Sequence, residues 1–570
     1  MEMESSSPGS QLKPPVELEQ QETKDKAGRK RGGWVTLPFI AGSMIGLGLA
    51  INGTTSNLLL YLLKEYNVES IQAAQIANIV RGSLNLVPVA GAVVSDSYFG
   101  CFPVVLAGTA INVLAFVLFT LTAALPSLRP AHCAPPPAAC QHATGGQLAV
   151  LYAAVCLLAI GTGGTRFNVA TLGADQFSSP RAQDVFFNWY FVFLYGSFIV
   201  GDTAIVYLQD GVSWVLGFSV CLAATVVSLV MLLLGARYYR MPAPKGSPYT
   251  DLARVVVAAV RKARVDVAGG RQVQYYVGDG AAAADPGSDG APSKRLRFLN
   301  RAAMITANDD SSTDAPARGH GSSGWRLCTV QQVEDLKSLL GVLPLWSSGI
   351  FVSLSIGLMI GMMILQALVM DRSLGPRFQI PAGSMTVCAL AAFIAVTPVF
   401  DRAVFPLWRR ATGAVPTPLQ RVGLGHVVNI AGVVAAALVE RRRLGVVRAH
   451  NGANEPNGWV TPMSVLWLLV PLGVVGVGEA LHFPGNMAFY YQEFPKTLRS
   501  TATAMAPLLV ALGFYLSTAF VDVVRRVTKW LPENINQGRL DNVYWAVAVG
   551  ATANFGYFLV CVSLYKSRVK

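Results

Sequence analysis

Charged side chains are scarce in this chain. Of its 570 residues, 14% are charged and 52% are hydrophobic, and the mean hydropathy is +0.44. Soluble globular proteins carry about 25% charged residues. The composition therefore excludes an ordinary soluble domain.

Long stretches of the chain lack polar interruptions. A helix needs roughly 20 apolar residues to cross the hydrocarbon core of a membrane. Twelve windows meet this length: 35–63, 70–95, 103–125, 147–171, 186–208, 213–236, 338–367, 381–404, 419–441, 462–483, 499–524 and 541–564. They are continuous runs and not the alternating segments of about 10 residues that form a β-barrel. The sequence predicts an all-α polytopic membrane protein.

Residues suited to catalysis or metal binding are few. The six histidines are scattered, and we find neither a His-Glu-x-x-His motif nor a Gly-x-Ser-x-Gly motif on a suitable turn. Cys133 and Cys140 follow the third window, and their spacing resembles no zinc site. An oxidising outer face would allow a disulfide between them, and the alternative is two free thiols. We expect no enzyme, no catalytic residue, no cofactor and no metal.

The net charge of +13 follows the expected membrane topology. Basic residues gather in Arg29-Lys30-Arg31, before the first window, and in the long segment between the sixth and seventh windows. We place both groups on the cytoplasmic side of the membrane, because cytoplasmic loops carry an excess of Lys and Arg. The partner of this charge is then the lipid bilayer and not nucleic acid. One run disagrees, since Arg441-Arg442-Arg443 follows the ninth window and should face outward.

The windows divide into two groups of six. Two six-helix bundles around a midplane cavity are the plan of major-facilitator transporters. Within the segment that joins them, 250–265 fits a helix lying on the membrane surface and 278–294 fits a disordered stretch. The expected organisation is a cytoplasmic disordered tail (1–33), an N-terminal bundle (34–236), a cytoplasmic linker (237–337), a C-terminal bundle (338–565) and a cytoplasmic tail (566–570).

Polar residues at hydrocarbon depth are the first candidates for function, because each is costly there. The candidates are Arg81, Arg166, Asp202, His426, Glu479 and His482. For Asp202 and His426 we favour a buried, hydrogen-bonded role. Arg166 and Glu479 come from opposite halves and could form a salt bridge across the cavity.

Helix geometry supports one of these candidates and adds another. His482 shares a helix face with Glu479, three residues away. Pro398 in the eighth window predicts a kink that could serve as a hinge for gating, as do Pro88 and Pro507 in other windows.

Several longer stretches resemble the plant nitrate/peptide transporter family, the proton-coupled oligopeptide branch of the major facilitator superfamily. They include "GAVVSDSYFG" (91–100), "GTGGTRFNVATLGADQF" (161–177), "VQQVEDLKSLLGVLPLW" (330–346) and "EALHFPGNMAFYYQEFPKTLRSTATA" (479–504). The resemblance runs from about Gly33 to the C-terminus. Residues shared with the nitrate-excretion-like branch of the second subfamily, such as "GGW" before the first window, place the chain near that branch.

The resemblance implies roles for single positions. Arg166 stands where the family has a basic residue on its fourth helix, and Glu479 stands where the family has the acid that binds substrate and forms a salt bridge. Asp96 fits the cytoplasmic loop motif of the superfamily and is a candidate gating residue. That motif normally continues with Gly-Arg or Gly-Lys, whereas this chain has Gly100-Cys101.

The first membrane window lacks the ionisable residues of the family. Its stretch "AGSMIGLGLAINGTTSN" (41–57) contains no charged side chain. The family has a Glu-x-x-Glu-Lys/Arg motif there, and its positions align with Met44, Leu47 and Gly48. Since the family uses these carboxylates to take up a proton, their absence predicts transport without obligate proton coupling.

The remaining charges favour an anionic substrate. Arg81, Arg166 and Glu479 give a net positive site, which suits a small anion such as nitrate or chloride better than a zwitterionic peptide. The expected protein is a multi-pass transporter of the plasma membrane, with both termini cytoplasmic, that favours low-affinity anion efflux. Alternatives are transport of a hormone or an anionic specialised metabolite, or a non-transporting nutrient sensor with the same fold.

Overall fold

The computed structural model describes residues 31–131, 141–241, 248–263, 275–276, 292–293, 295–305, 325–376, 378–452, 459–494 and 499–565. Cys133, Cys140, most of the tails and most of 278–294 lie outside these residues. Within them, twelve helical segments are long and apolar enough to cross a membrane. This agrees with the twelve windows expected from the sequence.

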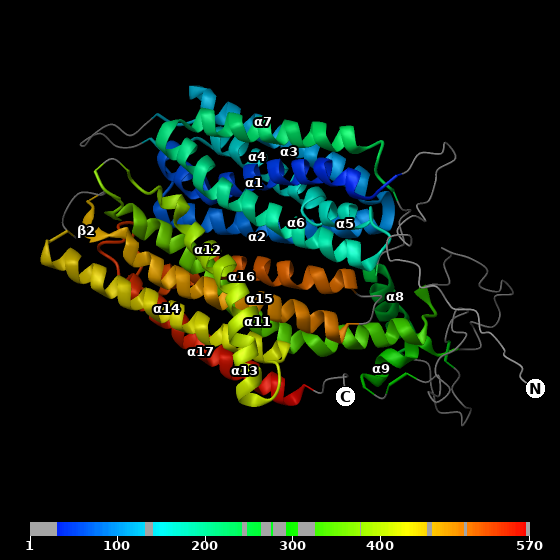
Figure 1. Ribbon diagram of the computed structural model, residues 1–570. Helices are drawn as coiled ribbons and strands as arrows, with labels where there is room; N and C mark the ends of the chain where they lie inside the picture. The colour runs from blue at the N-terminus through cyan, green and yellow to red at the C-terminus, as the bar shows by residue number, and fades with distance from the viewer. Residues whose placement is uncertain are drawn as a thin grey trace, which may run out of the picture.

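Two bundles lie one above the other in Figure 1. The N-terminal bundle contains α1 (Leu37–Glu65), α2 (Ser70–Val94), α3 (Cys101–Ala124), α4 (Gly145–Thr165), α5 (Asn168–Ala174), α6 (Pro180–Val200) and α7 (Trp214–Gly235). The C-terminal bundle contains α11 (Val330–Leu368), α12 (Thr386–Val399), α13 (Phe405–Thr412), α14 (Pro418–Ala449), α15 (Leu469–Glu493), α16 (Arg499–Val527) and α17 (Leu540–Leu564).

The two ends of the molecule are distinguished by small elements. At one end, here called the linker side, α8 (Pro248–Arg261) and α9 (Arg297–Asn300) lie beside the start of α11. At the other end, the sheet side, β1 (Met370–Asp371) and β2 (Thr461–Ser464) form a two-stranded parallel sheet. Helix α8 buries Val255 and Ala258 against the linker-side core and leaves Val260 exposed.

Local sequence explains several helix starts. Thr144, Thr329 and Thr417 each cap a helix, and each forms a reciprocal capping box with a glutamine three residues later. Each box satisfies backbone N–H groups that have no partner inside the helix. Helices α4, α11 and α14 therefore begin at defined positions.

Close packing of α1 depends on glycine. A Cβ atom at Gly46 would lie 2.6 Å from the carbonyl oxygen of Ala224 on α7. Small residues let membrane helices approach closely and gain van der Waals contact. Gly42, whose Cβ would lie 3.3 Å from Met231 of α7, and Gly46 thus form the face of α1 that contacts α7.

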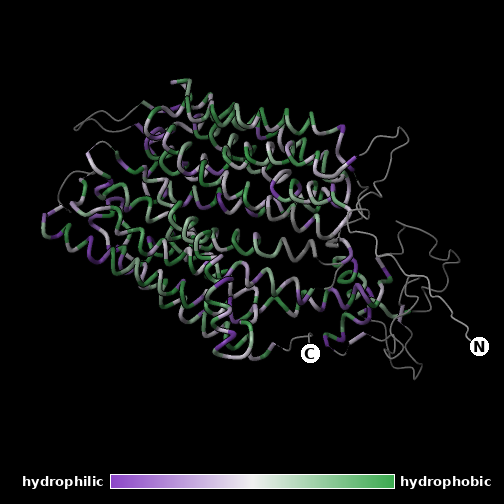
Figure 2. The backbone as a smooth tube through the Cα atoms, in the orientation of Figure 1, coloured by the Kyte–Doolittle hydropathy of each residue, from purple (hydrophilic) through white to green (hydrophobic). Residues whose placement is uncertain are grey.

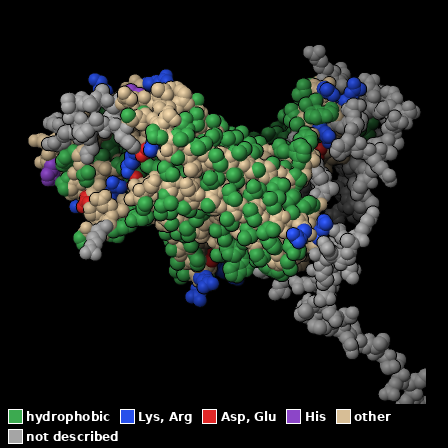
Figure 3. All heavy atoms as spheres, turned by 90° about the horizontal axis from the view of Figure 1, so that it is seen from above, with side chains coloured by type: hydrophobic (Ala, Val, Ile, Leu, Met, Phe, Trp, Pro, Cys, Tyr) green, Lys and Arg blue, Asp and Glu red, His purple; other side chains and the backbone are tan. Residues whose placement is uncertain are grey.

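Hydrophobic residues occupy the middle of the bundles, and hydrophilic residues concentrate toward the two ends (Figure 2). In the view from above, hydrophobic side chains cover most of the middle of the surface, while Lys and Arg lie mostly toward its ends (Figure 3). The chain is a multi-pass helical membrane protein whose middle is apolar and whose two ends are polar.

The basic run at 441–443 is not a loop, which corrects the helix end expected from the sequence. Helix α14 continues to Ala449, so these residues lie within it. Arg443 is fully buried, and it donates to Glu440 from Nε at 2.8 Å and from Nη2 at 2.7 Å. Arg442 stacks over the ring of Trp467, 4.1 Å from the ring centroid. Two of these three charges therefore have partners within the structure: Arg443 pairs with Glu440, and Arg442 stacks on Trp467.

Candidate functional site

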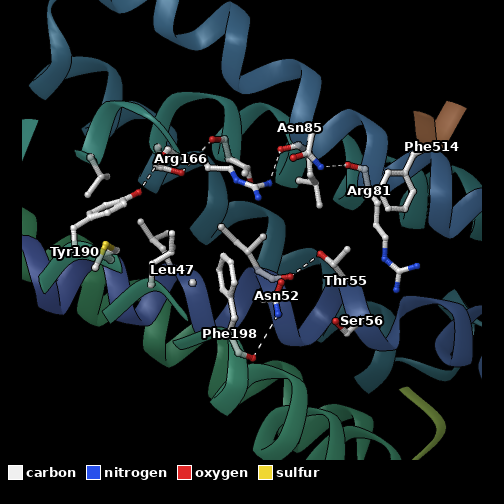
Figure 4. Close-up of a pocket in the computed structure, with 18 residues that line it drawn as sticks. Leu47, Asn52, Thr55, Ser56, Arg81, Asn85, Arg166, Tyr190, Phe198 and Phe514 are labelled. Carbon is white, nitrogen blue, oxygen red and sulfur yellow. Dashed lines mark hydrogen bonds between the residues drawn. The ribbon is translucent and has the colours of Figure 1, made fainter. Parts of the chain in front are cut away.

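A cavity of about 210 Å³ lies between the helices of the N-terminal bundle. Its walls come from α1, α2, α4, α5 and α6, and Phe514 of α16 is the one lining residue from the C-terminal bundle among the described residues (Figure 4). Met44, Leu47 and Gly48 are all lining residues. The three positions that we aligned with the helix-one motif therefore face the cavity with uncharged groups.

Arg166 lies at a break in a membrane-spanning segment. Helix α4 ends at Thr165 and α5 begins at Asn168, so Arg166 stands between the two. Its Nη1 donates to the carbonyl oxygen of Leu84 on α2 at 3.1 Å, which fixes the guanidinium against the cavity wall. Interrupted helices of this kind often form substrate sites in transporters.

Arg81 reaches the cavity from α2. It is 9% exposed, and neither Nη1 nor Nη2 has a hydrogen-bond partner in the described part of the chain. Figure 4 shows the side chain extending from α2 towards Ser56 of α1. Buried polar groups normally have partners, because an unpaired one costs free energy. Both Nη atoms therefore have donors free for hydrogen bonds in the cavity, while the guanidinium is also attracted by the Asp202 carboxylate behind the wall.

The cavity has positive charge without a matching carboxylate in its wall. Arg81 and Arg166 are its charged lining residues, and no Asp or Glu of the described chain lines it. At an effective dielectric constant of about 20, two unit charges 4 Å apart interact by about 4 kcal/mol. An anion within about 4 Å of either guanidinium would be attracted on that scale.

Glu479 and His482 lie on α15 and do not line this cavity. Glu479 is partly buried, and no ion pair joins it to Arg166 among the described residues in this conformation. His482 is fully buried within the C-terminal bundle. Its Nε2 is 3.0 Å from Nδ2 of Asn486, and its ring is 5.0 Å from that of His426. The structure thus brings Arg81 and Arg166 together and leaves the two α15 residues apart from them.

The two candidate gating residues lie beside π-helical turns. Asp96 belongs to the turn Ser95–Phe99 at the linker-side end of α2, and Gly100 follows with a φ of 79°. Pro398 is the penultimate residue of α12, directly before the turn Phe400–Val404. Such turns interrupt regular helix geometry and are frequent at functional sites.

Several polar lining residues were not recognised from the sequence, and two of them contact Asp202. Asn52 and Ser56 of α1 line the cavity, and both donate to Oδ1 of Asp202, at 2.7 and 2.6 Å. Asp202 is 4% exposed, so it is buried and hydrogen-bonded as expected. The four-residue spacing of Asn52 and Ser56 places them on one helix face, and this was the available signal.

The two bundles are joined at the sheet side. Asn78 of α2 donates to the carbonyl oxygen of Gly357 and to Ser517, both at 3.1 Å. Arg525 of α16 lies 3.7 Å from Glu69 and 3.9 Å from Glu533. Between described residues, no hydrogen bond or ion pair joins the bundles at the linker side.

The sequence comparison identifies the family. A profile of the POT family matches residues 102–537. This chain belongs to the POT family. Two Arabidopsis thaliana relatives in this family are NRT1/PTR FAMILY 2.3, 44% identical over 95% of this chain and 94% of that protein, and NRT1/PTR FAMILY 2.7, 45% identical over the same shares.

Solved POT structures share the fold. An auto-inhibited POT family peptide transporter covers 94% of this chain and 98% of its own, with a TM-score of 0.68 and 16% identity. The expected family and the major-facilitator fold are confirmed. This POT protein is a membrane transporter and not an enzyme.

Proposed function

We propose that this POT protein is an alternating-access transporter of a small anion, with nitrate as the favoured substrate and chloride as the alternative. The observation that carries the proposal is the charge of the cavity wall. Two arginines line the wall, and no carboxylate of the described chain does. A zwitterionic peptide needs both signs of charge, whereas a monovalent anion needs only the positive one.

The three helix-one positions support transport without obligate proton coupling. Met44, Leu47 and Gly48 line the cavity and carry no proton-accepting group. An anion that crosses alone responds to the membrane potential, which is worth about 2.3 kcal/mol per unit charge at 100 mV. In a plasma membrane that is negative inside, this free energy favours efflux.

The size of the cavity supports a small substrate. Sites for drug-sized ligands span roughly 300 to 1,000 Å³, and this cavity has about 210 Å³. A nitrate or chloride ion with part of its hydration shell fits such a volume. A hormone or a large specialised metabolite fits it less well.

The contacts between the bundles support alternating access. The described hydrogen bonds between them lie at the sheet side and near the bundle centre, so this conformation is closed at that side. We place the linker side and both termini in the cytoplasm, because basic residues concentrate there. We infer that in this conformation the site communicates with the cytoplasm.

The test is nitrate flux in proteoliposomes that contain the full-length protein. We expect Arg166→Gln and Arg81→Gln each to reduce flux at least about tenfold, because each removes a charged partner worth about 1.5–3 kcal/mol. Arg526→Gln is the matched control, since the Arg526 side chain is 77% exposed at the sheet side. We expect its flux to equal that of the parent.

Three outcomes would contradict parts of the proposal. Unchanged flux in both cavity variants, at equal protein content, would exclude this cavity as the anion site. Nitrate flux that requires an imposed proton gradient would exclude uncoupled transport. Saturable flux of a larger organic anion with none for nitrate or chloride would replace the substrate class.

A further inference from the structure

We propose that Asp202 is the latch that holds the two bundles together at the sheet side. The inference concerns the opening step and does not depend on which substrate is carried. It assigns a conformational role to a buried carboxylate outside the cavity wall.

Asp202 accepts hydrogen bonds from both halves of the molecule. From its own half, Asn52 and Ser56 donate to Oδ1. From the other half, Ser384 donates to the backbone carbonyl oxygen of Asp202 at 2.7 Å. The single hydroxyl proton of Thr386, at the start of α12, is shared between Oδ2 of Asp202 at 3.3 Å and the carbonyl oxygen of Gly383 at 3.2 Å. One residue therefore connects α1, the segment after α6 and the sheet-side end of α12.

The position of Asp202 is fixed by close helix packing. It belongs to the π-helical turn Gly201–Ile205, which continues α6. A Cβ atom at Gly53 of α1 would lie 2.7 Å from Cβ of Ile205 and 2.9 Å from the carbonyl oxygen of Gly201. The turn and α1 can only approach this closely because residue 53 has no side chain. This contact holds the carboxylate beside Asn52 and Ser56.

The opposite surface fits just as tightly. A Cβ atom at Gly383, in the short helix Ala382–Met385 before α12, would lie 2.9 Å from Oδ1 of Asn57 and 3.3 Å from the carbonyl oxygen of Ser56. This second observation does not involve Asp202. It shows that the start of α12 is seated directly on α1 where Thr386 and Ser384 reach the carboxyl residue.

The two sets of hydrogen bonds respond differently to opening. The donors from α1 belong to the same bundle as Asp202, so they stay with it when the bundles separate. The donors from Ser384 and Thr386 move away with the other bundle. Only interactions that differ between two states shift their equilibrium, so these cross-bundle bonds stabilise the closed sheet side.

Two opposing effects act on the Asp202 carboxyl group. Burial disfavours its charged form, whereas Arg81 of α2, in the same bundle, attracts it. The cross-bundle bonds rest on geometry and exist in either protonation state, and the bond from Thr386 is the stronger when Asp202 is ionised.

The experiment measures exposure of the sheet-side interface in the full-length protein in proteoliposomes. Thr518→Cys places a thiol on α16 opposite Gln75 of α2, where Thr518 is partly buried in the closed state. Its reaction rate with a membrane-impermeant thiol reagent reports opening, and the protein without this cysteine gives the background. No substrate is added, so failure of the proposed function would not affect the result.

We expect Thr386→Val to raise the reaction rate about tenfold, which corresponds to about 1.4 kcal/mol. Thr397→Val is the matched control, because the Thr397 hydroxyl bonds to Phe393 within the same helix α12. Asp202→Asn should raise the rate to a similar extent, and adding Thr386→Val to it should have little further effect. Such non-additivity is the signature of two groups that act through one contact.

A reaction rate in Thr386→Val equal to that of the parent would overturn the proposal. So would an equal increase in Thr397→Val, since the effect would then not come from the cross-bundle bond. Full additivity of Asp202→Asn and Thr386→Val would show that the two residues act separately. If Asp202→Asn fails to accumulate, Ser384→Ala combined with Thr386→Val keeps the test decisive, and an unchanged rate there contradicts the latch.

Discussion

The buried ion pair on α14 gives a prediction about stability. Arg443 and Glu440 are both fully buried, and they form a two-point contact. The change Arg443→Met removes the positive charge and preserves most of the apolar volume. Glu440 then remains in the interior with Gln366 as its described hydrogen-bond donor, at 2.5 Å.

The expected loss follows from the bonds removed. Two charge-assisted hydrogen bonds to Glu440 disappear, each worth about 1.5–3 kcal/mol. Arg443 also donates from Nη1 to Oδ1 of Asn536, and that acceptor loses its partner. Breaking a buried pair by removing one partner costs about 3–5 kcal/mol because an uncompensated charge remains. With about 2–4 °C per kcal/mol for a unit of 150–250 residues, the unfolding temperature should fall by roughly 6–20 °C.

The assay is thermal unfolding of the purified protein followed by intrinsic fluorescence. Arg442→Met is the control, because this neighbour is exposed and stacked on Trp467, so its loss should cost less than about 1 kcal/mol. Adding Glu440→Gln to Arg443→Met removes the orphaned charge and should recover at least half of the loss. An unfolding temperature within about 2 °C of the parent for Arg443→Met alone would refute the reasoning.

Three further changes test other parts of the structure. Gly46→Val should lower the unfolding temperature and the yield of folded protein, because its side chain would overpack against α7 by about 1–3 kcal/mol or more; an unchanged unfolding temperature would contradict this contact. The pKa of Glu533 is raised to about 7 from its ordinary 4.5, first by burial and then by the hydrogen bond and charge of Glu69. Protonation of Glu533 therefore stabilises the folded state. This contribution to the free energy of unfolding is complete below a pH of about 4.5 and is lost as pH rises through about 7. Glu533→Gln should therefore flatten the decline of the unfolding temperature between pH 5 and 8, and an identical pH profile in parent and variant would disprove this assignment. Lys64→Ala removes the ion-pair partner of Asp210, and since the Asp210 side chain is only 9% exposed the stability measured by unfolding should fall by more than the roughly 1 kcal/mol of a pair exposed on both sides; a smaller loss would contradict this.

The helices and part of the site follow from the sequence. Runs of apolar residues identify membrane helices directly, and the depth of Arg81 and Arg166 within such runs marked them as candidates. Their convergence on one cavity depends on which faces of α2 and α4 turn inward, and hydropathy does not report that. Asn52 and Ser56 were missed because small neutral polar side chains are common in membrane helices. Their four-residue spacing is a weak signal, and the tertiary contact with Asp202 is what distinguishes them.

The end of α14 shows a different limit. A run of three arginines is typical of a helix boundary, because isolated charges are expensive in hydrocarbon. In the structure the helix continues, since Arg443 finds Glu440 one turn earlier and Asn536 in another segment. The first partner could be read from the local sequence, but the second is 93 residues away. Long-range pairing of this kind decides whether a basic run ends a helix or remains within it.

Because one bundle lines almost the whole cavity, substitutions in the two bundles should affect two different kinetic quantities. Phe514 is the contribution of the C-terminal bundle among the described lining residues, so an ion in the cavity is held almost entirely by the N-terminal bundle. In the proposed transport cycle, an ion bound in the cavity would move with the N-terminal bundle, and the C-terminal bundle would mainly cover the cavity. Substitutions in the N-terminal bundle should then change the affinity for the ion, whereas substitutions in the C-terminal bundle should change the rate at which the bundles move.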